Sequence, residues 1–170
     1  MVELRTLSSQ DVAEFQRLRL EALQESPTAF SSSYEEERDR DLAKVAQRIA
    51  PDELGLIFGA FDGERLVGLT GFRREGGLKL KHKSFIWGMY VAPTYRRRGI
   101  GRKLIERVIS HAATVPGVRR INLGVNAANS PAIGLYEATG FKSYGVERAF
   151  LIVGGIEQDE ILMSCVITRA

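Results

Sequence analysis

One stretch decides how this sequence is interpreted, and it reads Val91-Ala92-Pro93-Thr94-Tyr95-Arg96-Arg97-Arg98-Gly99-Ile100-Gly101. It follows a β-prone run and leads into apolar residues at helical spacing, so it predicts a strand, a turn and a helix start. The first amides of a helix lack internal partners and carry a partial positive charge. Gly99 and Gly101 let such a backbone approach an anion, and the three arginines suit a diphosphate better than a single carboxylate.

The simpler alternative for this stretch is a solvated basic loop whose glycines serve a tight turn. The joint occurrence of strand, arginines, glycines and helix favours the anion site. No Gly-Lys-Ser/Thr follows, so the stretch is not a P-loop. It is not a dinucleotide fingerprint either, because Leu104 stands where a third glycine is required.

From this stretch outward, the apolar periodicity predicts strands and helices in the order β-α-α-β-β-β-α-β-α-β-β. We expect strands at 2–6, 56–61, 65–72, 78–91, 120–125, 141–150 and 160–168, and helices from Val12 to before Pro27 and at 42–49, 99–113 and 132–139. The strand–helix–strand piece around 87–125 favours parallel pairing, and the flanking hairpins, one with the turn Asp62-Gly63, favour antiparallel pairing. The predicted fold class is therefore α/β (α+β): a mixed, twisted sheet of about seven strands with helices on both faces.

The composition excludes several classes of protein and of site. The chain has 170 residues, which suits a single domain over 1–170, and a formal net charge of +3, which does not indicate a nucleic-acid binder. Cys165 is the only cysteine and there are two histidines, so neither a disulfide nor a metal site is expected. The first residues lack a secretory pattern and no apolar run reaches about 18 residues, so we expect a cytoplasmic protein with no membrane partner.

A second motif reads Asn129-Ser130-Pro131-Ala132-Ile133-Gly134-Leu135-Tyr136-Glu137-Ala138-Thr139-Gly140-Phe141. Asn129 is placed to cap a helix, and its side-chain amide could also contact a ligand, because the two roles are compatible. Tyr136 lies about two turns further on, where both side chains can share one side of the helix. A lone tyrosine there would be taken as a packing residue; its place in this motif favours a functional one.

Together these segments resemble the GNAT superfamily of acetyl-CoA-dependent N-acetyltransferases. The family's pyrophosphate loop, Gln/Arg-x-x-Gly-x-Gly/Ala after Val-x-Pro, matches Arg96, Gly99 and Gly101 together with Val91 and Pro93. The second motif is similar to the family's Asn-x-x-Ala-x-x-Leu-Tyr-x-x-x-Gly-Phe signature. The order of predicted elements is also the family's order, so the resemblance covers nearly the whole chain.

The resemblance implies a splayed pair of parallel central strands with pantetheine between them. Its backbone contacts would be Met89, Tyr90 and Val91, with Gly88 bending the strand. Acetyl-CoA would be the co-substrate, and the binding residues would be Met89, Tyr90, Val91, Arg96, Arg97, Arg98, Gly99, Ile100, Gly101 and Asn129. A backbone amide near Met89 or Val91 would stabilise the oxyanion, and Tyr136 would be the catalytic proton donor to the thiolate.

The general base is the missing part. Relatives often carry Glu at the positions of Gly124 and Phe85, and neither residue can accept a proton. The alternatives are a water chain or one of Glu35, Glu36, His82, Asp159 and Glu160. The acidic run 35–37 could instead attract a cationic amine. Strand alternation is expected to put Trp87 and Tyr90 on opposite or mixed faces, so that one lines the acceptor pocket and the other packs.

Three functions are in competition. The leading one is transfer of acetyl to a primary amine of a small molecule, with a protein N-terminus or lysine as the alternative acceptor. The second is a non-catalytic acyl-CoA-binding module, which the absent Glu favours and Tyr136 opposes. The third is nucleic-acid binding through the three arginines. A homodimer through the final strands, around Gly154-Gly155, is also expected from the resemblance.

Overall fold

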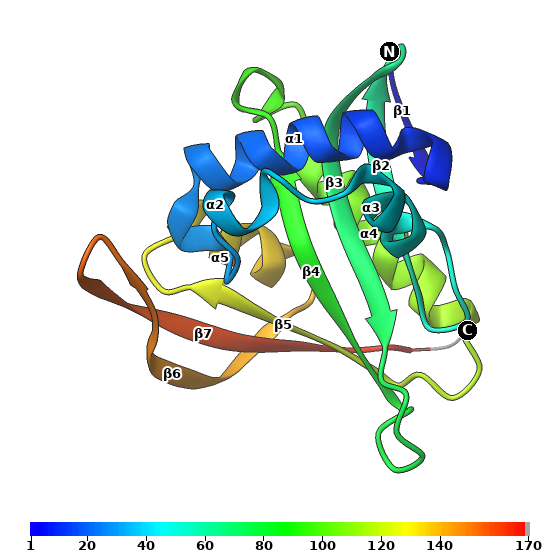
Figure 1. Cartoon of the computed structure of the whole chain (residues 1–170). Helices are drawn as coiled ribbons and strands as arrows, with labels where there is room; N and C mark the ends of the chain where they lie inside the picture. Colours follow the sequence, from blue (N-terminus) through cyan, green and yellow to red (C-terminus); the bar gives the residue numbers. More distant parts are fainter. Residues whose placement is uncertain (169–170) are drawn as a thin grey trace.

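The computed structural model describes residues 1–168 and contains a sheet of seven strands flanked by helices (Figure 1). The strands are β1 (Val2–Thr6), β2 (Gly55–Asp62), β3 (Arg65–Arg74), β4 (Lys83–Val91), β5 (Arg120–Asn126), β6 (Lys142–Val153) and β7 (Ile156–Val166). The helices are α1 (Val12–Glu25), α2 (Tyr34–Glu37), α3 (Leu42–Ile49), α4 (Ile100–Thr114) and α5 (Ser130–Ala138), with short 3-10 turns at Ser9–Asp11, Pro27–Ala29 and Pro93–Tyr95.

The sheet order is β1-β2-β3-β4-β5-β7-β6, and only the β4–β5 pair is parallel. This parallel pairing is short: Lys83, Ser84 and Phe85 pair with Arg120, Ile121 and Asn122, and no later residue of β4 pairs with β5. The two strands diverge from that point, as Figure 1 shows. The predicted mixed sheet with a splayed central pair is confirmed.

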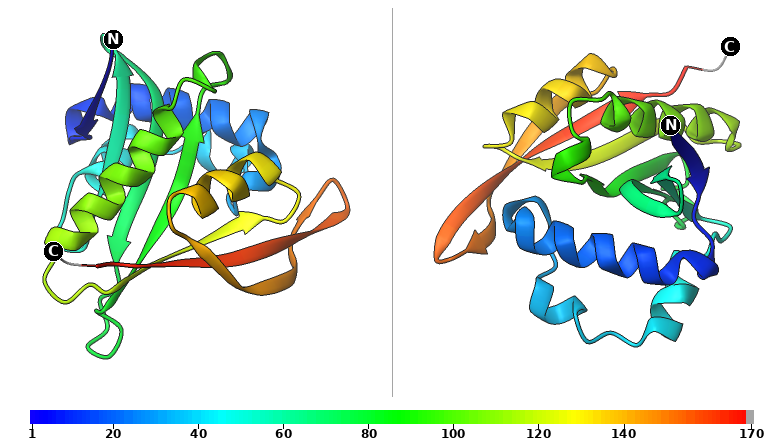
Figure 2. Two further views of the ribbon diagram at one scale, coloured as in Figure 1. Left: turned by 180° about the vertical axis from the view of Figure 1, so that it is seen from behind. Right: turned by 90° about the horizontal axis from the view of Figure 1, so that it is seen from above.

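Helices cover both faces of the sheet, again as predicted (Figure 2). On one face α1 and α3 pack against β2 and β3 and form one core with them. The most buried residues of this core include Phe15, Leu18, Ile49, Phe61 and Leu66. On the other face α4 and α5 pack on the sheet through a second core, whose buried members include Ile100, Leu104, Val108, Tyr136 and Phe141. The opening between β4 and β5 therefore lies between two separate helical layers.

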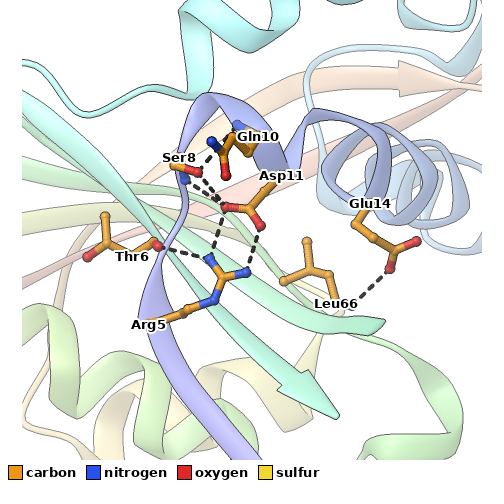
Figure 3. A network of polar contacts seen from close by, with 7 residues as sticks. All are labelled: Arg5, Thr6, Ser8, Gln10, Asp11, Glu14 and Leu66. Atoms are coloured by element: carbon orange, nitrogen blue, oxygen red, sulfur yellow. Dashed lines mark hydrogen bonds and ion pairs between the residues drawn. The ribbon is translucent and has the colours of Figure 1, made fainter. Parts of the chain in front are cut away.

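A polar network joins β1 to the start of α1 (Figure 3). Ser8 and Asp11 form a capping box, and Arg5 donates two hydrogen bonds to the Asp11 carboxylate at 2.9 and 2.7 Å. One turn later, the Glu14 carboxylate accepts a hydrogen bond from the Leu66 amide at 2.9 Å. These contacts fix α1 against β1 and β3, and they hold the pKa of Asp11 down at about 2, chiefly through Arg5.

The structure corrects two sequence predictions and adds one helix to which no prediction applied. Residues 78–82 were expected to be strand, but they form a turn in which Leu80 and Lys81 donate to the Gly77 carbonyl. The polar segment after Phe30 contains the short helix α2, which begins with a capping box between Ser33 and Glu36. The last two strands are longer than predicted and form an extended hairpin.

Candidate active site

Strand β4 is bent by a bulge at its centre. Leu69 pairs with Tyr90 and Gly71 pairs with Trp87, so one residue of β3 faces two residues of β4. Gly88 occupies the bulge with φ +65°, a left-handed conformation that glycine adopts most readily. The glycine-linked bend expected here is present in the structure, and it lies where β4 leaves β5.

The bulge also reverses the expected direction of one aromatic side chain. Trp87 and Tyr90 both pack with the α1 and α3 core, although simple alternation was expected to separate them. Tyr90 is 5% exposed and its hydroxyl lies 3.3 Å from the Glu21 carboxylate, whereas Trp87 is only half-buried. Met89 and Val91 pack on the opposite, α4 side.

The start of α4 is held open by backbone conformation. Gly99 is the N-cap with φ +77°, Arg97 has φ +60°, and no side chain caps the helix. The earliest helical amide that bonds back to the backbone is that of Lys103, which donates to the Gly99 carbonyl at 3.1 Å. Gly99 itself is exposed. The amides before Lys103 are thus placed as a helix N-terminus without a cap, which is the arrangement that binds anions.

The three arginines have different surroundings. Arg96 donates to both Glu25 carboxylate oxygens at 3.1 and 2.7 Å and to the Val91 carbonyl at 2.9 Å. This guanidinium holds the pKa of Glu25 below its usual range. Arg98 lies over the Tyr95 ring at 5.0 Å, and both Arg97 and Arg98 are exposed. The Arg96 side chain therefore ties the loop to α1, and the other two guanidinium groups are the ones open to a ligand.

Gly101 also has a packing role. A Cβ on this residue would lie 3.1 Å from Leu135 and 3.3 Å from Met89, so it would point into the packing between α4, α5 and β4. The absent side chain lets α4 approach β4 closely. Ile100 is 4% exposed and anchors the same turn in the core.

Helix α5 carries the second motif. Asn129 is the N-cap and accepts a hydrogen bond from the Ala132 amide at 3.3 Å, which is the capping role expected of it. Tyr136 is 5% exposed, and its ring meets Phe141 edge-on with centroids 5.7 Å apart. Burial raises the pKa of the Tyr136 phenol above its ordinary value, so the group is fully protonated at neutral pH.

A cavity of about 690 Å³ lies on the other side of the splayed strands. Its lining comes from the 27–32 segment, α3, β4, β5 and the β6–β7 hairpin, and includes Phe85, Trp87, Gly88, Gly124, Asn126, Phe150, Gln158 and Glu160. Trp87 stands over Gly71, where an added Cβ would lie 2.1 Å from the indole ring. The positions of Phe85 and Gly124, singled out from the sequence, both face this cavity.

Charges around the cavity are mostly paired. The Arg19 guanidinium donates to both oxygens of buried Glu37 at 3.1 and 3.0 Å, and Arg73 forms an ion pair with Asp52 at 3.1 Å. Arg48 lies over the Trp87 ring at 5.7 Å. Sequence reasoning missed Arg48, Asn126 and Gln158, because their helix and strands meet only in the folded chain.

The candidate bases differ in their position relative to the cavity and in their side-chain partners. Glu36 is used in the α2 capping box, and Glu35 is exposed, and neither residue lines the cavity. His82 precedes β4, at the opposite end of the strand from the arginine loop. Asp159 lines the cavity, but Arg148 and the Ala149 amide hold its carboxylate. Glu160 lines the cavity, and its carboxylate forms neither a hydrogen bond nor an ion pair with any residue in 1–168.

Other site types find little support. Within residues 1–168 no group of three His, Cys, Asp or Glu is arranged to hold a metal ion. No helix in this described part is long and apolar enough to cross a membrane. Cys165 is 6% exposed, and burial raises the pKa of its thiol, so it belongs to the core as expected.

The sequence matches the model of the acetyltransferase (GNAT) family over residues 17–141, and the chain belongs to this family. The [ribosomal protein bS18]-alanine N-acetyltransferase of Salmonella typhimurium is 35% identical over 83 residues, which are 49% of this chain and 55% of that protein. The match thus spans about half the length of this curated relative.

Two solved structures show the likeness of fold. A GNAT-family acetyltransferase from Streptococcus pneumoniae has a TM-score of 0.88 at 19% identity, covering 99% of this chain and 100% of its own. The Salmonella typhimurium protein yncA, solved with its cofactor acetyl-CoA, has a TM-score of 0.82 at 18% identity, covering 100% of this chain and 96% of its own.

Proposed function

We propose that this protein transfers the acetyl group of acetyl-CoA to a primary amine by direct attack in a ternary complex. The observation that carries the proposal is the opening between β4 and β5. It lies between an uncapped helix N-terminus that can hold a diphosphate and a separate cavity that can hold the amine. A two-sided site of this kind brings a thioester and a nucleophile together without a covalent enzyme intermediate.

On the cofactor side, the amides at Gly99, Ile100 and Gly101 are the proposed ligands of the diphosphate, with Arg97 and Arg98 adding charge. Residue 96 contributes through its backbone, because its side chain is engaged by Glu25. The pantetheine arm then follows the unpaired edge of β4 beyond Phe85, along Met89, Tyr90 and Val91.

The chemistry needs an oxyanion donor and a proton donor. A backbone amide at the bulge, near Met89, is the proposed oxyanion donor, because the bulge takes this part of β4 out of regular pairing. Tyr136 is the proposed proton donor to the departing thiolate. Its phenol is protonated at neutral pH, and its ordinary pKa near 10 makes it a fair donor to a thiolate of similar basicity.

A small-molecule amine is the acceptor that we favour. The cavity volume falls in the range of small-ligand pockets, and the β6–β7 hairpin residues Phe150 and Gln158 form one of its walls. The alternative acceptor is a protein N-terminus, and the observation in its favour is the activity named for the Salmonella relative.

The test is a screen of amines with thiol detection of released CoA. The panel contains amino acids, polyamines, aminoglycosides and short peptides with free N-termini. Turnover with a small amine supports the proposal, and turnover with peptides alone would move the acceptor to a protein. Tight CoA binding without turnover on any amine would identify a binding module, and displacement by DNA but not by CoA would identify a nucleic-acid site.

A further inference from the structure

We propose that Glu160 of β7 is the general base of the acetyl transfer, filling from a neighbouring strand the place where β5 has only a glycine. This inference rests on the proposed function and adds to it the residue that removes the proton from the acceptor.

The register of the sheet brings the two positions together. β5 pairs antiparallel with β7, and Asn126 lies opposite Glu160 while Gly124 lies opposite Leu162. Gly124 and Glu160 are thus diagonal neighbours on the same face of the sheet. A Cβ built on Gly124 would lie 2.2 Å from both Cδ and Oε1 of Glu160 and 2.5 Å from Oε2. The Glu160 carboxylate therefore occupies the space that a side chain at position 124 would fill.

The surroundings of Glu160 differ from those of the other carboxylates near the cavity. The carboxylates of Asp52, Asp159 and Glu37 each have an arginine partner, whereas the Glu160 carboxylate forms no ion pair or hydrogen bond with the described residues. It is half-buried, and both burial and the cross-strand neighbour Glu147 raise the pKa of its carboxyl above its usual range. A carboxylate without a partner and with an elevated pKa accepts a proton more readily than an ordinary surface Glu.

The position is also the right one. Glu160 shares the cavity lining with Trp87 and Gly88, the residues at the β4 bulge. An amine that approaches a thioester through the opening between β4 and β5 must pass Gly124 and hence the carboxylate above it. Position 124 carries no base of its own because a neighbouring strand supplies the base.

The proton balance of the reaction closes with Glu160 as the acceptor and Tyr136 as the donor. The acceptor arrives as an ammonium ion, and Glu160 takes one proton to leave a neutral amine. The nitrogen lone pair attacks the thioester carbonyl, the C–S bond breaks with its electron pair going to sulfur, and Tyr136 protonates the thiolate. The new amide nitrogen loses its second proton to solvent, solvent reprotonates Tyr136, and Glu160 releases its proton, so one proton is produced per acetyl transferred.

The experiment compares Glu160→Gln with Glu157→Gln, which removes an exposed carboxylate from the same strand. For an amine that the wild-type protein acetylates, we expect Glu160→Gln to lower kcat at pH 7 by about 100-fold or more. The affinity for CoA, measured by calorimetry, and the melting temperature should stay close to those of the wild type. The defect should shrink as the pH approaches the pKa of the amine, because the free amine then needs no base. Glu157→Gln should have wild-type kinetics.

Two further measurements make the assignment specific. The charged groups around Glu160 are its cross-strand neighbour Glu147 and the other charged residues of the cavity lining, Arg19, Arg48, Asp52, Arg73 and Asp159, of which Asp159 is held by Arg148. Because the Glu160 pKa is raised, the acid limb of the wild-type kcat/KM profile should lie above the ordinary Glu range, and it should vanish in Glu160→Gln. The double variant Gly124→Glu, Glu160→Ala, which moves the carboxylate to β5, should recover part of the lost rate.

The outcomes separate the two proposals. Wild-type transfer that Glu160→Gln leaves unchanged, with the same pH profile, would overturn the base assignment alone. Failure of the wild-type protein to acetylate any amine while it binds CoA would overturn the proposed function and the base assignment with it.

Discussion

The left-handed N-cap at Gly99 gives the sharpest prediction about the diphosphate site. Gly99 has φ +77°, and a Cβ added there would meet nothing within 4 Å. A Gly99→Ala change is therefore a pure backbone perturbation without a steric clash. A non-glycine residue in this conformation costs about 1–2 kcal/mol. The free loop of the variant is expected to relax, and CoA binding then has to restore the left-handed turn at that cost.

The strain at residue 99 of the variant predicts a measurable loss of CoA affinity. A cost of about 1–2 kcal/mol predicts a loss of CoA affinity of about 5- to 30-fold, measured by calorimetry. Gly63→Ala is the matched control, because Gly63 has φ +61°, also has nothing within 4 Å, and lies in the β2–β3 turn. The control should lose about 1 kcal/mol of unfolding free energy in urea and keep wild-type affinity. Equal CoA affinity in Gly99→Ala and the wild type would refute the role given to this turn.

Three further predictions address the core and the chemistry. Asp11→Asn should destabilise the fold by about 1–2 kcal/mol at pH 7, because the partly exposed Arg5 lowers the pKa of the Asp11 carboxyl from 3.8 to about 2 in the folded protein. This contribution to stability is present above about pH 4 and is lost towards about pH 2. Urea unfolding curves of the variant and the wild type should therefore converge at low pH. Tyr136→Phe should lower kcat by about 100-fold with acetyl-CoA binding retained, and a surviving rate would mean that sulfur is protonated by another route. Gly71→Ala should lower the free energy of unfolding by about 1–3 kcal/mol, because the new methyl group displaces Trp87. It should also raise KM for the amine more than KM for acetyl-CoA. An unchanged KM for the amine would show that Trp87 does not contact the acceptor.

The parts of the fold that local sequence patterns determine were predictable. The apolar stripe of α1, the Asp62-Gly63 hairpin and the strand–turn–helix around Gly99 all depend on neighbours within a few residues, and the structure contains them. The segment 78–82 misled because Leu78 and Leu80 imitate strand alternation, yet both are exposed in a turn. Periodicity cannot distinguish a buried alternating leucine from an exposed one.

The candidate site was harder to predict, because it depends on contacts between segments that are distant in the sequence. The ion pair of Arg96 with Glu25, and the placement of Glu160 over Gly124, each join residues far apart in the sequence. No local motif records the β5–β7 register that creates the second contact. The bulge at Gly88 was expected, but its effect on the directions of Trp87 and Tyr90 could be seen only once the pairing with β3 was known.

The long β6–β7 hairpin bears on the expected homodimer. Its edge strand β6 exposes Tyr144, Val146 and Ile152, and Ile156 follows on β7. Apolar side chains on an edge strand are typical of surfaces that pair with another chain. Dimer formation through this hairpin stays a prediction from the family resemblance.

The central claim is that the amides opening α4 hold the diphosphate of acetyl-CoA, and amide NMR during a titration tests it most directly. The account predicts that the resonances of Gly99, Ile100 and Gly101 move together, further than those of the β2–β3 hairpin, and saturate at one equivalent. Unshifted resonances at these three residues, in a protein saturated with acetyl-CoA, would contradict it.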